Sequence, residues 1–439
     1  MASLMPSSTS MALLHNVPKF VHLFVAAFVF LTVIRLYLFP LLTSSAFSWR
    51  PSAPAPPPLP PPPAPGAVVM AGKEYSSKCD ISKGKWVPNP NAPYYTNDTC
   101  WAIHEHHNCL KYGRPDDGFM RWRWRPDGCD LPVFNPAQFL ELVRHKSLAF
   151  VGDSVGRNHM QSLLCLLLRA TYAVDASPVQ DENFRRYRFP SHNFTVASFW
   201  SPFLVRAQEA DDDDPSGLLN LYLDEPDTSW SREIAQFDYV IISAGQPFLR
   251  PTMFYENRRL VGCHYCRSPN VTDLTKYYGY RMAFHTALRV FTDDLRGFGG
   301  TVFLRTYSPT HFEGGEWDRG GDCMRLRPFR RDEARLDEVA FQMYMTQMEE
   351  FRAAEREGRK KSVKLRLLDT TEAMLLRGDG HPGRYGHVAG ANVRMYNDCV
   401  HWCLPGPIDT WNDFLLHTMK NEGRRLATRR RPGNERKPS

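Results

Sequence analysis

Short apolar segments alternate with longer amphipathic segments in the part of the chain beyond residue 145. The apolar segments predict β-strands, because runs of five to seven apolar residues bounded by polar turns are typical of buried strands. The amphipathic segments predict helices, because their apolar residues recur every three or four positions. The expected strands are residues 147–151, 237–243, 301–306 and 364–369, and the expected helices are 156–170, 277–295, 332–357 and 409–419.

This alternation predicts an α/β fold with a mostly parallel sheet flanked by helices. Active sites in such sheets lie at the carboxyl ends of the strands. Ser154 follows the first expected strand, and Gly245 and Gln246 follow the second. We therefore expect these three residues to lie near the same edge of the sheet.

The segment before this domain has a different composition. Residues 72–145 are rich in turns and contain four tryptophans between Cys79 and Cys129. We interpret this segment as a disulfide-stapled N-terminal subdomain, followed by a catalytic domain over residues 146–420.

The N-terminal 71 residues indicate a membrane anchor and a stalk. Residues 20–42 are apolar apart from isolated polar positions, and a membrane helix needs about 20 such residues. No small-residue cleavage site follows, so the prediction is an uncleaved signal anchor after a short tail over 1–19. Residues 43–71 include ten prolines between positions 51 and 65, a composition typical of an extended polyproline stalk.

The cysteines and sequons place the bulk of the chain in an oxidising compartment. All ten cysteines lie beyond residue 78, and an even number of scattered cysteines favours disulfides. Asn97, Asn193 and Asn270 each begin a glycosylation sequon on the same side of the anchor. The expectation is a single-pass type II protein with its folded part in the lumen.

The net charge of +7 is concentrated at the C-terminus. Residues 424–439 hold seven Arg or Lys and one Glu, a net charge of +6, so the folded part is nearly neutral. We interpret residues 421–439 as a basic disordered tail, and we expect no nucleic-acid partner.

Two short motifs supply the residue types of a serine-based acyl transfer site. Gly152-Asp153-Ser154 follows the first expected strand, and Asp398-Cys399-Val400-His401 lies near the end of the chain. A serine hydroxyl becomes a good nucleophile when a histidine takes its proton and a carboxylate orients that histidine. The alternative for Asp398 and His401 is a surface ion pair. The order Ser first and Asp-x-x-His last is that of SGNH or GDSL-type hydrolases, and it predicts Ser154, His401 and Asp398 as a triad.

Other clusters have less distinctive patterns. His104, His106, His107 and Cys109 have the spacing of metal ligands, but lumenal cysteines are usually oxidised, and we predict no metal site. The run of four aspartates at 211–214 lacks the spaced ligands of a calcium loop. Arg305 lies at the end of the third expected strand, and His311, Glu316 and Asp322 follow it. They could contact an acceptor sugar or simply pair with one another.

Five further motifs resemble those of one plant family. These motifs span residues 79–80, 151–158, 308–312, 314–323 and 398–406, with sequences such as VGDSVGRN, GGEWDRGGDC and DCVHWCLPG. The chain resembles the trichome birefringence-like proteins, Golgi-anchored polysaccharide O-acetyltransferases, over nearly all of residues 75–420.

The resemblance implies an SGNH-like fold and assigns the acetyl transfer to Ser154, His401 and Asp398. It also implies five disulfides, Cys79–Cys129, Cys100–Cys165, Cys109–Cys403, Cys323–Cys399 and, by what remains, Cys263–Cys266. The chain departs from the usual pattern because residues 243–246 offer no oxyanion-hole asparagine. Besides the amide of Ser154, the candidates are Arg157 and Asn158, with Gly152, Asp153, Gly245 and Gln246 nearby.

The expected function is therefore acetyl transfer to a plant cell-wall polysaccharide in the Golgi through an acyl-serine. Residues 255–257 and 261–266 look like the subgroup linked to xyloglucan, so side-chain galactose is the first expected acceptor, and mannan or xylan is the second. No bound cofactor is expected. The donor is acetyl-CoA or a membrane protein that supplies acetyl groups. The rival functions are a hydrolytic acetylesterase, which would use the same triad with water, and a noncatalytic polysaccharide-binding tether.

Overall fold

A seven-stranded sheet forms the centre of the computed structural model. Its strands run in the order β13-β12-β9-β3-β6-β5-β4. The strands from β13 to β6 are parallel, and β5 and β4 add an antiparallel edge. Strand β3, which precedes Ser154, is central because it pairs with both β6 and β9. The bounds are β3 Ser147–Gly152, β4 Val174–Asp175, β5 Phe184–Phe189, β6 Phe194–Trp200, β9 Tyr239–Ser243, β12 Thr301–Arg305 and β13 Lys364–Leu368.

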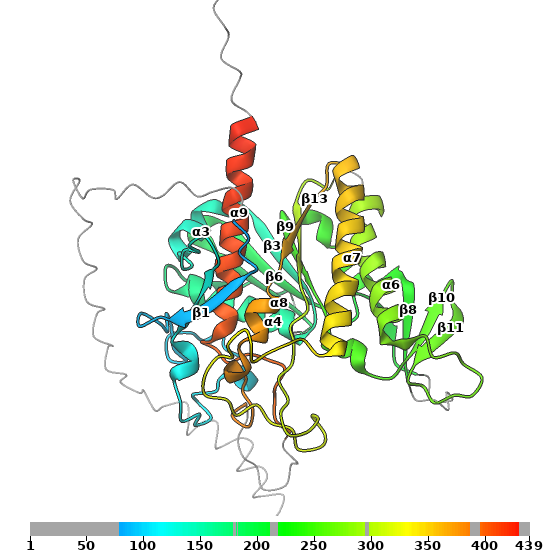
Figure 1. Ribbon diagram of the computed structural model, residues 1–439. Coiled ribbons are helices and arrows are strands. Elements are labelled where there is room, and N and C mark those ends of the chain that lie inside the picture. The colour runs from blue at the N-terminus through cyan, green and yellow to red at the C-terminus, as the bar shows by residue number, and fades with distance from the viewer. Residues whose placement is uncertain are drawn as a thin grey trace, which may run out of the picture. The chain divides into compact units, whose positions relative to one another are not determined.

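Helices cover both faces of this sheet (Figure 1). The alternation of side chains along β3 explains the two layers, since Leu148 and Phe150 point into one apolar core and Ala149 and Val151 into the other. The first core also contains residues of α3, α4, α8 and α9, and the second contains residues of α6 and α7. Their bounds are α3 Pro136–Leu142, α4 Ser154–Leu168, α6 Thr275–Arg289, α7 Glu338–Lys360, α8 Thr371–Leu375 and α9 Thr410–Arg429, with the short α5 at Thr228–Ser231.

Two smaller sheets complete the architecture. A four-stranded sheet in the order β11-β10-β8-β7 packs beside α6, and β1 and β2 form a two-stranded antiparallel sheet. The bounds are β1 Gly84–Pro88, β2 Trp122–Pro126, β7 Val205–Gln208, β8 Leu219–Pro226, β10 Thr252–Glu256 and β11 Arg259–His264. Trp86 and Trp124 of this two-stranded sheet belong to the same core as α4 and α9. The N-terminal segment is thus packed onto the catalytic fold within one compact unit.

The structure describes residues 79–178, 181, 183–210, 218–294, 298–386 and 396–429. The expected anchor, the stalk, the Asp211–Asp214 run and most of the basic tail lie outside these residues and stay predictions. Within the described part of the chain, no helix is long and apolar enough to cross a membrane. The three sequon asparagines are all at partly or fully exposed positions.

The α/β class, the parallel core of the sheet and the four expected strands are confirmed, with ends shifted by up to two residues. Helix α9 differs because it continues to Arg429, into the segment expected to be a disordered tail. Helix α7 begins later than expected because Asp337 caps it by accepting a hydrogen bond from the Ala340 N–H. All five disulfides implied by the resemblance are present, and no free cysteine remains.

Candidate active site

Ser154 is the first residue of α4 and follows the central strand β3 through a tight connection. Gly152 has a φ of 150°, and a Cβ there would lie 1.6 Å from the carbonyl oxygen of Ser243 on β9, so only glycine fits. Asp153 then caps α4, because its Oδ1 accepts hydrogen bonds from the N–H groups of Val155 and Gly156 at 3.1 and 3.2 Å. The Ser154 side chain is therefore presented at a helix N-terminus, at the carboxyl end of the sheet.

Asp398 and His401 form a local turn. Asp398 Oδ1 accepts hydrogen bonds from the backbone N–H groups of Val400 and His401, at 3.1 and 2.9 Å. Its second oxygen accepts from His401 Nδ1 at 2.8 Å, which fixes the tautomer and leaves Nε2 able to accept a proton. His401 Nε2 lies 2.6 Å from Ser154 Oγ. The structure thus brings the three predicted residues into hydrogen-bond contact.

The electrostatics of this group suit a proton acceptor. Burial alone would raise the pKa of Asp398, but His401 and the two backbone N–H groups lower that pKa well below its usual range. Burial also opposes a charged His401, yet Asp398 is near enough to raise the pKa of His401 above its ordinary value of 6.5. The carboxylate stays ionised and stabilises the imidazolium that forms when His401 takes a proton.

Several residues that hold the turn come from distant segments, and sequence reasoning missed these roles. Asn158 on α4 donates to the Trp402 carbonyl at 3.2 Å and accepts from the Trp402 N–H at 2.8 Å. His381 Nδ1 donates to the backbone carbonyl of His401 at 2.6 Å, and its ring stacks on Trp402 at 4.1 Å. Two disulfides, Cys323–Cys399 and Cys109–Cys403, tie the same turn to the rest of the fold.

His107 packs directly beside His401. The ring centroids of His107 and His401 are 5.2 Å apart, and His107 Nδ1 lies 2.8 Å from the Gln161 side-chain oxygen. Burial lowers the pKa of His107 to about 3, so it is neutral beside His401. In the segment from His104 to Cys109, Cys109 is bonded to Cys403 and has no thiolate to offer a metal ion.

Two expected sugar contacts lie elsewhere. Arg305 is buried under the sheet edge, where its guanidinium donates to Ser243 Oγ and to the Thr306 carbonyl. His311 is also buried, 2.7 Å from His381 Nε2. The expectation that Arg305 and His311 contact an acceptor is wrong, because both side chains are buried and already form hydrogen bonds inside the protein.

The side chains expected to stabilise an oxyanion already have hydrogen-bond or stacking partners within the protein. The Asn158 amide is buried and already bonded to Trp402 at both ends, so it cannot serve an oxyanion. Arg157 stacks its guanidinium on Trp200 at 4.6 Å. Gln246 lines the pocket but donates to the Tyr307 hydroxyl and the Ser308 carbonyl. The N–H of Ser154 is a candidate donor, because it lies in the first turn of α4, where the helix provides no acceptor.

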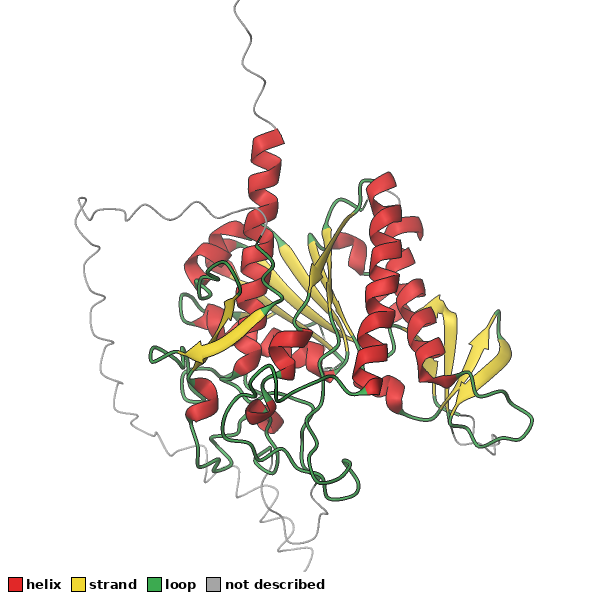
Figure 2. Cartoon of the chain, in the orientation of Figure 1, coloured by secondary structure: helices red, strands yellow, loops and turns green. Residues whose placement is uncertain are grey.

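Ser154 and His401 open into a pocket of about 430 Å³. The long loops that follow the strands gather at this end of the large sheet (Figure 2). Aromatic and apolar side chains provide much of the lining, among them Trp200, Phe203, Phe312, Trp317 and Tyr396. A pocket of this size and composition can hold a sugar beside the nucleophile.

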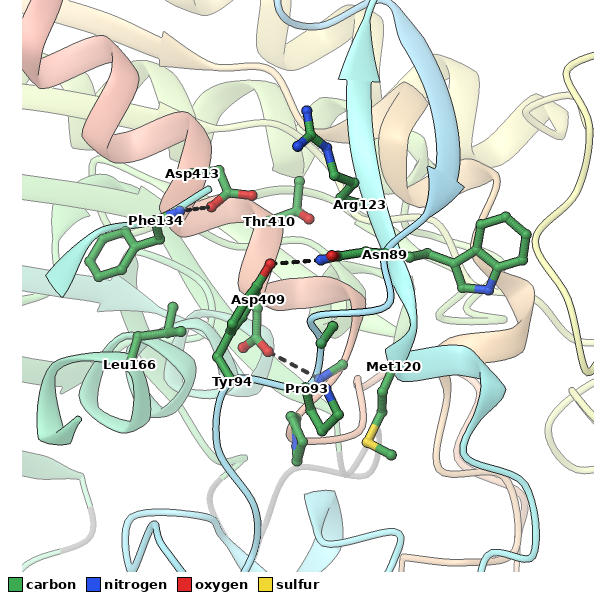
Figure 3. Close-up of a pocket in the computed structure, with 14 residues that line it drawn as sticks. Asn89, Pro93, Tyr94, Met120, Arg123, Phe134, Leu166, Asp409, Thr410 and Asp413 are labelled. Carbon is green, nitrogen blue, oxygen red and sulfur yellow. Dashed lines mark hydrogen bonds between the residues drawn. The ribbon is translucent and has the colours of Figure 1, made fainter. Parts of the chain in front are cut away.

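A second pocket lies where the N-terminal segment packs on the start of α9 (Figure 3). It has a volume of about 20 Å³ and contains none of the triad residues. Asp409 accepts hydrogen bonds from Tyr95 and Ser162, and Asp413 accepts from the Phe134 N–H at 2.6 Å. Burial raises the pKa of Asp409 to about 6 and that of Asp413 to about 8. This pocket therefore belongs to the buried contact between the N-terminal segment and the start of α9.

We expect Asp413→Asn to stabilise the protein at alkaline pH. An unfolded aspartate has a pKa of about 3.9, so the folded state holds the Asp413 proton more tightly and loses stability as the pH rises from about 4 to about 8. Asparagine removes this cost and keeps an oxygen for the Phe134 N–H. Thermal unfolding should show a gain on the order of 1 kcal/mol at pH 8 that shrinks toward pH 4. The exposed Asp332→Asn is the control, and an equal gain at every pH would contradict the prediction.

Comparison with known proteins gives the class to which this fold and site belong. Residues 131–418 match the PC-Esterase model, a GDSL/SGNH-like acyl-esterase family found in Pmr5 and Cas1p, and residues 77–130 match the PMR5 N-terminal domain. The chain therefore belongs to this acyl-esterase family.

Named relatives make the assignment more particular. The chain is 57% identical to trichome birefringence-like protein 19 of Arabidopsis thaliana over 348 residues, which cover 78% of this chain and 81% of the relative. It is 42% identical to xyloglucan O-acetyltransferase 4 of Populus trichocarpa, over 78% of this chain and 81% of the relative. It is 41% identical to xyloglucan O-acetyltransferase 2 of Arabidopsis thaliana, over 77% and 82%. The resemblance to the trichome birefringence-like proteins is thus confirmed.

Proposed function

We propose that the protein is a polysaccharide O-acetyltransferase that acetylates a hydroxyl of xyloglucan, with side-chain galactose as the acceptor sugar. The observation that carries this proposal is the contact chain from Ser154 Oγ to His401 Nε2 at 2.6 Å and from His401 Nδ1 to Asp398 at 2.8 Å. The names of the relatives support xyloglucan as the polysaccharide. The proposed compartment is the Golgi lumen, reached through an uncleaved anchor at residues 20–42.

The reaction proceeds by double displacement. Ser154 Oγ attacks the acetyl carbonyl of the donor while its proton passes to His401 Nε2. The oxyanion that forms is stabilised by the Ser154 N–H and the positive end of the α4 dipole. The intermediate then expels the donor's leaving group, which takes the proton from His401. In the second half, His401 takes the proton of a sugar hydroxyl, the sugar oxygen attacks the acyl-serine, and the proton returns to Ser154 Oγ.

Acetyl-CoA is the proposed donor, and an acetyl-supplying membrane protein is the alternative source. The test incubates the purified full-length protein with acetyl-CoA and separate xyloglucan, mannan and xylan oligosaccharides. Mass spectrometry should find one added acetyl group on the xyloglucan fragments, which glycosidase digestion then places on galactose. Acetate release that exceeds sugar acetylation would instead indicate a hydrolytic esterase. Acetylation of mannan or xylan alone would overturn the acceptor assignment.

The pH dependence of the reaction should report the state of His401. The base must be neutral to take the serine proton, and Asp398 raises the pKa of His401 above 6.5. We therefore expect kcat/KM to fall at acid pH with an apparent pKa above 6.5. In Asp398→Asn the acid limb of the residual activity should shift to lower pH, because the carboxylate that holds the proton on His401 is gone. A limb at the same pH in both proteins would show that another group titrates.

A further inference from the structure

An exposed pair of aromatic rings forms one wall of the catalytic pocket. Trp317 and Tyr396 both line this pocket, and their ring centroids lie 5.4 Å apart. Trp317 is 57% exposed and Tyr396 is 43% exposed, although side chains of this size usually bury most of their surface. An exposed apolar surface that is continuous with a catalytic pocket indicates a binding surface.

The loops that carry the two rings are firmly attached to the triad. The loop of Trp317 is closed by reciprocal backbone hydrogen bonds between Glu313 and Asp322, at 2.7 and 2.9 Å. Asn397, next to Tyr396, donates to the Gly321 carbonyl at 2.9 Å. The Cys323–Cys399 disulfide then joins this loop to the Asp398–His401 turn. The aromatic wall is therefore held at a fixed position relative to the nucleophile.

The charge around the wall decides which of the two substrates it fits. Residues 313–322 contain four acidic side chains and one arginine; Glu313 is ion-paired with Arg325, and Arg250 also lines the pocket. The acidic side chains that remain make the loop less favourable for a donor that carries several phosphates than for a neutral sugar. The C–H face of a pyranose ring packs well on an indole ring, and its hydroxyls can remain in water. The wall thus has the chemistry of a carbohydrate platform.

We propose that Trp317 and Tyr396 form an acceptor subsite. One sugar ring of the polysaccharide stacks on them, and the neighbouring sugar of the same chain is the one that is acetylated. This inference rests on the proposed function, since it assigns the polysaccharide to one side of the same pocket. A stacked neighbour would position the reacting hydroxyl near Ser154 and His401. The Cys323–Cys399 disulfide then has a second role. Besides holding the triad turn, this bond sets the spacing between the aromatic wall and the nucleophile.

The test measures binding in a full-length chain that carries Ser154→Ala, so that no acetyl transfer interferes. Isothermal titration with xyloglucan oligosaccharides should show that Trp317→Ala weakens binding about tenfold, the order expected for loss of one good aromatic contact. Trp317→Phe should restore most of the affinity. The matched control is Trp101→Ala, since Trp101 is also 57% exposed but packs on Tyr187, away from the pocket.

Each other outcome overturns the proposal. Equal weakening by Trp101→Ala, or unchanged affinity in Trp317→Ala, would show that the wall does not bind the acceptor. Weaker binding of acetyl-CoA with unchanged oligosaccharide affinity would assign the wall to the donor. No detectable binding of any xyloglucan, mannan or xylan oligosaccharide would also refute the subsite. Because these measurements do not depend on acetyl transfer, they can succeed even where the transfer assay for the proposed function fails.

Discussion

Ser154→Ala should reduce acetyl transfer on the order of a thousandfold or more while leaving the fold intact. The variant removes the atom that lies 2.6 Å from His401 Nε2, so no acyl-serine can form. The fold should tolerate the change because Asp153, not Ser154, caps α4. Acetyl transfer to oligosaccharides is measured alongside thermal unfolding, and intact-protein mass spectrometry checks for the acetylated enzyme.

The three triad positions should behave as one unit. His401→Ala alone should cost about as much activity as the double variant with Ser154→Ala, since either change stops the same proton transfer. Asp398→Ala should cost less in rate than Ser154→Ala but should also loosen the turn, because its Oδ1 accepts two backbone N–H groups. Activity within tenfold of wild type in a folded Ser154→Ala protein would exclude the double displacement mechanism.

The parts of the site that could be predicted from the sequence are those built from local signals. Ser154 could be placed because an apolar strand, a Gly-Asp-Ser turn and an apolar helix follow each other within about 25 residues. Asp398 and His401 could be paired because three residues of separation bring a carboxylate to an imidazole in one turn. In both cases the spacing along the chain fixes the geometry before any tertiary contact forms.

The supporting residues could not be predicted, because their roles depend on contacts between distant segments. Asn158 has the polarity of an oxyanion donor, but it is 244 residues from Trp402 and is bonded to it in space. Arg305 ends β12 and His311 follows it in a polar loop, and both are buried by contacts with distant segments, among them Leu375 of α8 and Trp411 of α9. The aromatic pair of Trp317 and Tyr396 was missed for the same reason.

The strands outside the parallel core show the limits of the hydrophobic pattern. Strand β5 has the sequence FRRYRF, in which three arginines and partial burial conceal the strand next to the sheet edge. Strands β10 and β11 form a hairpin with mixed polarity and a register shift, so they give no clean alternation. Helix α9 extends to Arg429 although its last residues are polar. Polar strands near the sheet edge and in the smaller sheet therefore form by pairing with neighbouring strands and not by their own pattern.

The second large effect concerns the disulfides of the catalytic turn. Removing either Cys323–Cys399 or Cys109–Cys403 should lower both activity and thermal stability. These bonds close loops of 76 and 294 residues, which in the chain-entropy model contribute about 4.5 and 5.7 kcal/mol. They also hold the segment between Asp398 and Cys403, where a displacement of about 1 Å can cost roughly a hundredfold in rate. Paired Cys→Ala changes are the suitable variants, because the buried sites would disfavour a serine hydroxyl.

The matched control is the removal of Cys263–Cys266, which closes a loop of three residues and lies on β11, outside the catalytic pocket. Its loss should cost far less stability and little activity, since a short loop gives up little entropy and no triad residue touches it. Thermal unfolding and acetyl transfer are compared for the three paired variants, and peptide mapping without reduction verifies the remaining bonds. Full activity without Cys109–Cys403 and Cys323–Cys399 would show that hydrogen bonds from Asn158 and His381 suffice to hold the turn.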